Sequence, residues 1–362
     1  MSADRVNAIC RAEESAARSA ADPAAEAERQ QWERMYAQAL ALHVHELMAS
    51  RSPRDLLAAA MLSMIGSGRD PSERSAGAAD PAVAFAAAHR LGSGDRLVAW
   101  MEMLDCPGIS GEPSCDPDAA LLRLQRMEPG NAAVWIHALQ AAHDQGDEMA
   151  VDRLLARAAS AQKYEIPFGE IARMLFAALQ GVNAPPLPDR LAREYGTDLG
   201  RAATLDDHAA IAAMGLAVAV AMPGHGTLSQ ICVGNDGRPL LAHRLSACIS
   251  IYAHMAQDPL LISQRISLTS LARLTADSPA GPMWRERLRT LSWVWSEGSK
   301  QVTRRVPDGY LQSVWRNGEM VALEGVLRAA GLPGTPPPGW LPETGRDRAL
   351  VTTGRLPPDP AR

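Results

Sequence analysis

Apolar residues recur at helical spacing between residues 128 and 161. The first half of this stretch places apolar side chains three or four positions apart, at Trp135, Ala138, Leu139 and Ala142. After Gly146 and Asp147 the same spacing returns at Val151, Leu154, Leu155 and Ala158. Each half is typical of an amphipathic helix. Two such helices joined by a tight turn form an antiparallel hairpin, and neighbouring helices must cover its apolar face.

This hairpin resembles a tetratricopeptide-type repeat. The junction MEPGNAAVW at residues 127–135 is similar to that family's repeat boundary, and Gly146–Asp147 is similar to its turn. A weaker second copy covers residues 80–104, with matching positions at Ala86, Ala87, Gly94, Asp95, Ala99 and Met103. The chain departs from the family pattern at Leu139, Val151 and Lys163. The resemblance implies stacked helical hairpins, and it implies no chemistry.

Helix-start signals extend this pattern along the chain. An acidic residue precedes proline at Asp80, Asp116 and Asp258, and Thr204 with Asp207 forms a capping box. Further helices are expected near residues 205–222, 239–256, 260–276, 283–300 and 308–330. We therefore predict an all-α fold of stacked hairpins, a TPR-like α-solenoid in two lobes. The lobes are residues 1–180 and 204–331, with a Pro/Gly-rich joint at 181–203 and a proline-rich, extended or disordered tail at 332–362.

Composition and charge narrow the choice of partner and compartment. Aromatic residues are only 4% of the chain, which favours helices over sheets. The net charge of -5 argues against a nucleic-acid partner. Residues 56–66 and 209–222 are apolar but shorter than the roughly 20 residues of a membrane span, and the first thirty residues lack a secretory core. We expect a cytoplasmic protein; a periplasmic one would require a different N-terminus and oxidised cysteines.

The five cysteines fit no tight metal or redox motif. Cys106 and Cys115 flank a short loop and could form a disulfide, and Cys232 and Cys248 form a second loose pair. For a cytoplasmic protein, reduced thiols are expected instead. No metal and no cofactor is predicted.

Histidines and carboxylates offer weak catalytic candidates. His43 and His45 are two positions apart, which places them on different faces of a helix. Asp206 and Asp207 precede His208, but the capping box already accounts for Asp207. His225 lies between glycines after an apolar helix, in what we expect to be a loop, and is the candidate ligand-binding residue. Neither a nucleophile elbow nor a phosphate-binding loop accompanies these residues.

A basic and aromatic stripe marks the C-terminal part of the chain. Its members are Trp284, Arg285, Arg289 and Trp293. Arginine and tryptophan are enriched at interaction hot spots, so we predict that this stripe binds a partner protein.

The sequence favours a protein–protein interaction scaffold or adaptor of bacterial type over an enzyme. A helical-repeat surface would bind the partner, with varied polar side chains facing its groove. Two alternatives remain open: a helical enzyme with a site between the lobes near His225 and Asp206, and an anionic-ligand or nucleic-acid binder that uses the Trp/Arg stripe.

Overall fold

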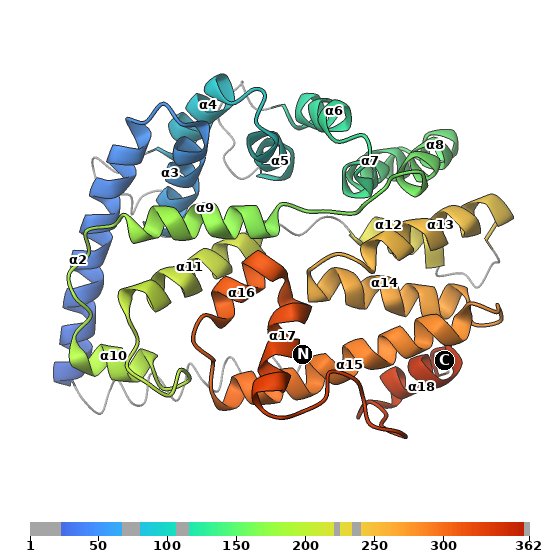
Figure 1. Cartoon of the computed structure of the whole chain (residues 1–362). Coiled ribbons are helices and arrows are strands. Elements are labelled where there is room, and N and C mark those ends of the chain that lie inside the picture. Colours follow the sequence, from blue (N-terminus) through green and yellow to red (C-terminus); the bar gives the residue numbers. More distant parts are fainter. Residues whose placement is uncertain (1–22, 67–79, 106–115, 221–224, 234–239, 358–362) are drawn as a thin grey trace.

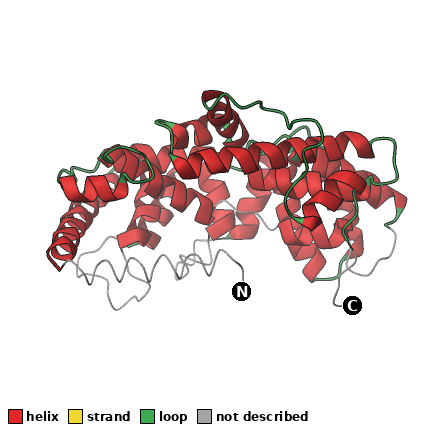
Figure 2. Cartoon of the chain, turned by 90° about the horizontal axis from the view of Figure 1, so that it is seen from below, coloured by secondary structure: helices red, strands yellow, loops and turns green. Residues whose placement is uncertain are grey.

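The computed structural model describes residues 23–66, 80–105, 116–220, 225–233 and 240–357. Within these ranges the chain folds into helices without a strand, which confirms the predicted all-α class (Figure 2). The helices are α2 (Pro23–Met48), α3 (Pro53–Gly66), α4 (Pro81–Leu91), α5 (Arg96–Asp105), α6 (Pro117–Met127), α7 (Ala132–Asp144), α8 (Glu148–Ala159), α9 (Phe168–Gln180), α10 (Asp189–Tyr195), α11 (Leu205–Val220), α12 (His225–Val233), α13 (Ala242–Met255), α14 (Leu261–Leu274), α15 (Gly281–Arg304), α16 (Tyr310–Asn317), α17 (Glu319–Ala329) and α18 (Gly345–Thr353).

The predicted helix starts are capped as the sequence indicates. Asp80 and Asp116 accept N–H groups of α4 and α6, each at 2.9 Å. Thr204 and Asp207 bond reciprocally: the Thr204 N–H donates to the Asp207 carboxylate at 2.8 Å, and the Asp207 N–H donates to the Thr204 hydroxyl at 3.2 Å. These side chains satisfy N–H groups that the first turn leaves without partners.

The hairpin predicted at residues 128–161 is the pair α7 and α8. Gly146 turns the chain with φ +67°, and Asp147 caps α8 by accepting the Ala150 N–H at 2.9 Å. Leu139 and Leu155 are buried on the facing sides, whereas Trp135 is half-buried and donates to the Pro129 carbonyl at 2.9 Å. Similar close pairs are α3 with α4 and α5 with α6, and α2 packs on α3 (Figure 1).

The later helices return along the first ones. Helix α9 packs against both α3 and α11, α12 lies on α7, and α13 lies on α8 (Figure 1). Arg244 of α13 connects α13 to α8: its Nε donates to Asp152 and its Nη2 donates to Glu148, at 2.6 Å each. Helices before and after residues 181–203 therefore contribute to one hydrophobic core, and the segment predicted as a joint contains helix α10.

Two predictions for the C-terminal part require correction. The single helix expected over residues 308–330 is two helices, because Gly318 adopts φ +91° against the Pro259 backbone. Residues 332–362, expected to be extended or disordered, contain α18, which Thr344 caps by accepting the Asp347 N–H at 3.1 Å. Leu350 of this helix is buried. Burial of an apolar face stabilises this short helix despite its proline-rich flanks.

One cysteine pair also differs from expectation. Cys232 of α12 and Cys248 of α13 form a disulfide with a Cα–Cα distance of 5.7 Å, where reduced thiols were expected. The two helices hold the buried sulfur atoms face to face, a relationship that sequence spacing does not reveal. Cys106 and Cys115, the other proposed pair, lie outside the described residues. No helix in the described ranges has the length and hydropathy needed to cross a membrane.

Candidate functional site

Three adjoining hollows lie between the first helices and α9, and we call them together the central groove. Their volumes are about 510, 540 and 280 Å³. The first and second share Arg54, the second and third share Glu170 and Arg173, and the first and third share Arg96 and Glu165. Because neighbouring hollows share these walls, they lie side by side in a row that extends from α2 to α16.

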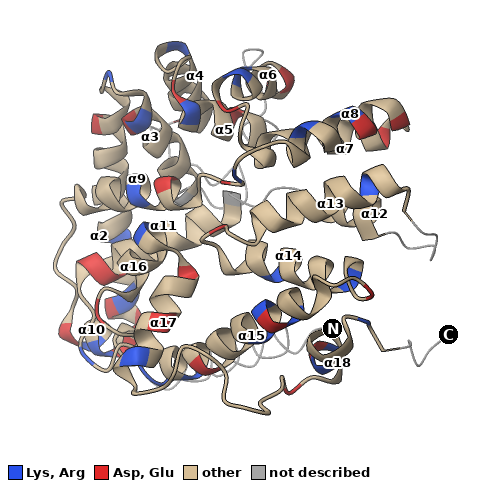
Figure 3. Ribbon diagram, turned by 45° about the vertical axis from the view of Figure 1, so that its right-hand side comes forward, with Lys and Arg blue, Asp and Glu red and all other residues tan. Residues whose placement is uncertain are grey.

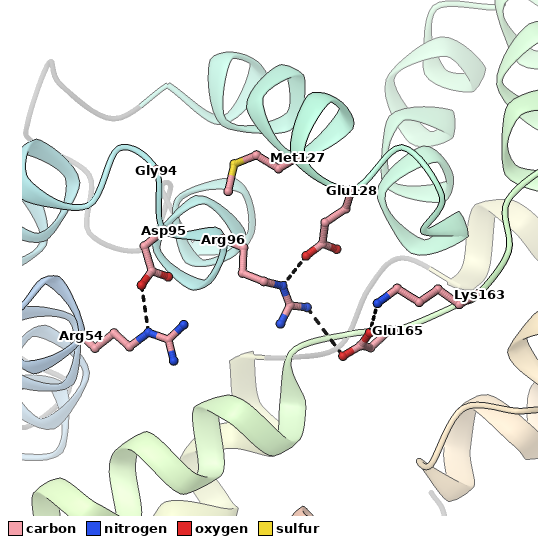
Figure 4. Close-up of a pocket in the computed structure, with 8 residues that line it drawn as sticks. All are labelled: Arg54, Gly94, Asp95, Arg96, Met127, Glu128, Lys163 and Glu165. Carbon is pink, nitrogen blue, oxygen red and sulfur yellow. Dashed lines mark hydrogen bonds and ion pairs between the residues drawn. The ribbon is translucent and has the colours of Figure 1, made fainter.

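Arg96, at the start of α5, organises the first hollow (Figure 4). It lies between Glu128 and Glu165: its Nε donates to Glu128, and its Nη2 is 3.8 Å from Glu165 Oε1. Nη1 donates to Glu170 Oε2 at 2.6 Å. Burial alone would lower the pKa of Arg96, but the three carboxylates outweigh it and raise that pKa. Nη2 is itself buried without a hydrogen-bond partner.

A second ion pair forms the wall of the groove toward α3. Arg54 Nε donates to Asp95 Oδ2 at 2.8 Å, and Asp95 Oδ1 accepts the Leu97 N–H at the start of α5. Burial opposes the charge on Asp95, but Arg54 and the helix N–H groups prevail and lower its pKa. Next to this pair, Gly94 is exposed, and a side chain there would meet open space.

The groove continues over α9 toward α16. Arg173 of α9 lines the second and third hollows, and its Nη1 donates to the Trp315 carbonyl at 2.7 Å. No carboxylate among the described residues pairs with Arg173. His43 of α2 closes the far end, with a buried Nε2 that lacks a hydrogen-bond partner. The groove thus offers alternating cations and carboxylates, and some polar atoms without partners.

Side chains of the predicted Trp/Arg stripe make contacts within the fold. Trp284 and Trp293 are buried. Trp293 donates to the Pro333 carbonyl at 2.9 Å and packs edge-on against Trp340, with ring centroids 5.4 Å apart. Arg289 pairs with Glu286 at 2.8 Å and reaches the carbonyls of Pro337 and Trp340 at 3.3 Å.

Arg285, the last member of the stripe, is half-buried, and its Nη1 is 3.5 Å from the Ala276 carbonyl. Within the stripe, the segment between α17 and α18 contacts Arg289 and Trp293.

His225 is the first residue of α12 and is buried, whereas a loop was expected. Its Nε2 lies 2.7 Å from the Tyr164 hydroxyl. Burial lowers the pKa of His225 to about 4, so at neutral pH the imidazole is uncharged and shares a neutral hydrogen bond with the Tyr164 hydroxyl. Asp206 lies in the first turn of α11, and its Oδ1 accepts from the Gln180 side-chain amide at 3.2 Å. The two candidates therefore have different hydrogen-bond partners among the described residues.

Sequence reasoning missed a buried polar group around Tyr164. Asp258, 1% exposed, lies near enough to raise the pKa of Tyr164 further above the value that burial sets. Burial raises the pKa of Asp258 itself to about 7. Ser263 stands beside both residues without reaching hydrogen-bond geometry, so its hydroxyl and Asp258 Oδ2 are buried without partners. In sequence, Asp258 has the signature of an ordinary cap before proline.

Other histidine candidates contribute no metal site. His43 pairs with Glu46 at 3.0 Å, and Nδ1 of His45 lies 2.8 Å from the Ala41 carbonyl. In the part of the chain that the structure describes, no three side chains of the metal-binding types are gathered as ligands. Searches of family models, curated proteins and solved structures found no match to this chain.

Proposed function

We propose that the protein is an interaction scaffold and that the central groove binds an extended segment of a partner protein. The observation that carries the proposal is the row of three adjoining hollows, which share arginine and glutamate walls contributed by helices far apart in sequence. Guanidinium groups and carboxylates can pair with the carbonyl, N–H and charged groups of an extended chain.

The chemistry of the groove supports binding more than catalysis. Arg54 and Arg96 are held by carboxylates on several sides, so they are rigid and charged. A general acid or base needs a pKa near the working pH, and Asp258, whose pKa burial raises to about 7, is not among the residues that line the groove. Because ion pairs already fix these side chains, the groove loses less conformational entropy when a segment binds.

Site-specific photocrosslinking in lysate of the native cell tests this proposal. Met127 lines the first hollow and is 39% exposed, so a photoreactive residue there is expected to capture the bound segment. Met149 on α8 is 73% exposed and lies outside the groove, which makes it the matched control position. Mass spectrometry then identifies the captured peptide.

The expected result is one partner segment linked from position 127 and absent from position 149. Equal capture at both positions would show nonspecific contact and contradict the proposal. Capture only from position 149 would move the binding surface to the α7–α8 hairpin.

A further inference from the structure

A fourth hollow lies between α12, α14 and α18 and shares no lining residue with the central groove. Its volume is about 810 Å³, within the range of small-molecule sites. Helix α14 supplies Arg265, Thr269 and Arg273 at intervals of four, which places all three on one helix face. Arg346, at the start of α18, lines the same hollow. Figure 3 draws the basic residues of α14 and α18 in blue.

The cations of this hollow are not balanced by its acids. Among the lining residues that the structure describes, Asp347 is the acidic one, and it is already paired with Arg265 Nη2 at 2.5 Å. Arg265 is further fixed by Ser292 at 3.3 Å and by stacking 5.3 Å over Trp295. The guanidinium group of Arg265 is therefore held in place by contacts within the protein.

Arg273 and Arg346 differ from Arg265. Neither has a hydrogen-bond or ion-pair partner among the described residues. Burial lowers the pKa of Arg273, and the positive charge of Arg346 lowers it further, so the two groups are close enough to repel each other. Since the whole chain carries a net charge of -5, this local excess of positive charge is not a consequence of general basicity. Two unpaired cations that face each other across a hollow are stabilised by an anion between them.

Hydroxyl groups complete a polar end of the hollow. Ser229, Thr269 and Ser270 line it. Behind Ser229 and Ser270, the Tyr252 hydroxyl is fully buried without a hydrogen-bond partner. Apolar side chains form the remaining wall, namely Val233, Ile266, Leu350 and Leu356.

We propose that this hollow binds a small organic phosphate monoester, with Arg273 and Arg346 on the phosphoryl oxygens and the apolar wall against the organic group. A phosphoryl dianion has three terminal oxygens, so it can bridge both guanidinium groups and still accept from the hydroxyls. The cavity exceeds what inorganic phosphate fills, and its apolar wall favours a ligand with a nonpolar part.

Calorimetric titration with phenyl phosphate and with inorganic phosphate tests the proposal, in chloride buffer of matched ionic strength. Phenyl phosphate is expected to bind, and at least tenfold more tightly than inorganic phosphate. Arg273→Gln and Arg346→Gln are each expected to weaken its binding at least tenfold. Arg348→Gln is the matched control, because Arg348 lies on the same helix outside the lining and contacts only the Glu343 carbonyl among the described residues, at 3.3 Å.

Thermal melting shows whether each variant is folded. Arg346 is exposed at the start of α18, so Arg346→Gln preserves the test if Arg273→Gln does not fold. Absence of phenyl phosphate binding to the unmodified protein at millimolar concentration would overturn the proposal. Equal weakening by Arg348→Gln and Arg346→Gln would also overturn it, since it would show general attraction to a basic surface. Equal affinity for phenyl phosphate and inorganic phosphate would overturn the proposal that the hollow recognises an organic phosphate monoester.

Discussion

The side-chain amide of Asn131 donates to the Glu128 carboxylate at 2.7 Å and so holds that carboxylate beside Arg96. Its second N–H donates to the Glu165 carbonyl at 2.8 Å, while Oδ1 accepts the N–H groups of Ala133 and Glu165 at 3.2 and 2.9 Å. One buried side chain thus caps α7, fixes the segment before α9 and positions a wall of the central groove.

Asn131→Ala is expected to lower the free energy of unfolding by about 2 to 4 kcal/mol, because it removes these bonds and leaves buried groups without partners. Urea denaturation measures the change. Asn131→Asp keeps the acceptor but loses the N–H donors and places a second carboxylate against Glu128, so it is also expected to lower the free energy of unfolding at pH 7. If Asn131→Ala lowered the free energy of unfolding by less than about 1 kcal/mol, the structural role given to Asn131 would be contradicted.

Asp258 and His225 are expected to change the free energy of unfolding with pH in opposite directions. Asp258 has a folded pKa of about 7, above the ordinary 3.8, so the folded state keeps a proton that the unfolded state has released. Unfolding free energy therefore falls as pH rises from about 4 to 7. His225, with a folded pKa of about 4 against 6.5, contributes a rise with pH over about 4 to 6.5.

Chemical denaturation of single variants across pH 4 to 8 separates these two effects. Asp258→Asn keeps an acceptor for the Leu260 N–H, and it is expected to stabilise the protein at pH 8 by about 2 to 4 kcal/mol, with little change at pH 4. His225→Gln should remove the contribution of His225 to the rise between about pH 4 and 6.5. Destabilisation by Asp258→Asn at pH 8 would mean that the carboxylate is charged and paired.

The backbone of Gly318 cannot accommodate a side chain. A Cβ there would lie 2.5 Å from the Pro259 Cβ, at φ +91°. Gly318→Ala is expected to lower the free energy of unfolding by about 2 to 4 kcal/mol, because the new side chain strains the backbone and overpacks the site. The control is Gly325→Ala in α17, which meets open space and should stabilise by up to about 1 kcal/mol. Equal effects of the two changes in thermal melting would refute this explanation.

The Cys232–Cys248 disulfide closes a loop with a sequence separation of 16. Its reduction is expected to lower the free energy of unfolding by about 3 kcal/mol. Melting with and without dithiothreitol measures this loss, and a Cys232→Ala/Cys248→Ala variant should melt alike in both buffers. Alkylation of both thiols in unreduced, denatured protein would show that the bond is absent.

Local patterns in the sequence predict the helices but not the sites. Spacing and capping identify the α7–α8 hairpin because those interactions span only a few residues. The central groove combines Arg54, Arg96 and Arg173, which come together only after α9 packs across the earlier helices. The Trp/Arg stripe has the composition of an interface, yet only tertiary structure shows that Arg289 and Trp293 contact residues 333–340.

Filling the groove tests the proposed function most directly. Gly94 faces open space in the first hollow, so Gly94→Trp occupies the groove without disturbing the backbone. Gly334→Trp, at a glycine that also meets open space but lies outside the groove, is the control. The segment captured from position 127 is titrated into each folded protein. The account predicts at least tenfold weaker binding to Gly94→Trp and unchanged binding to Gly334→Trp; undiminished binding to Gly94→Trp would contradict it.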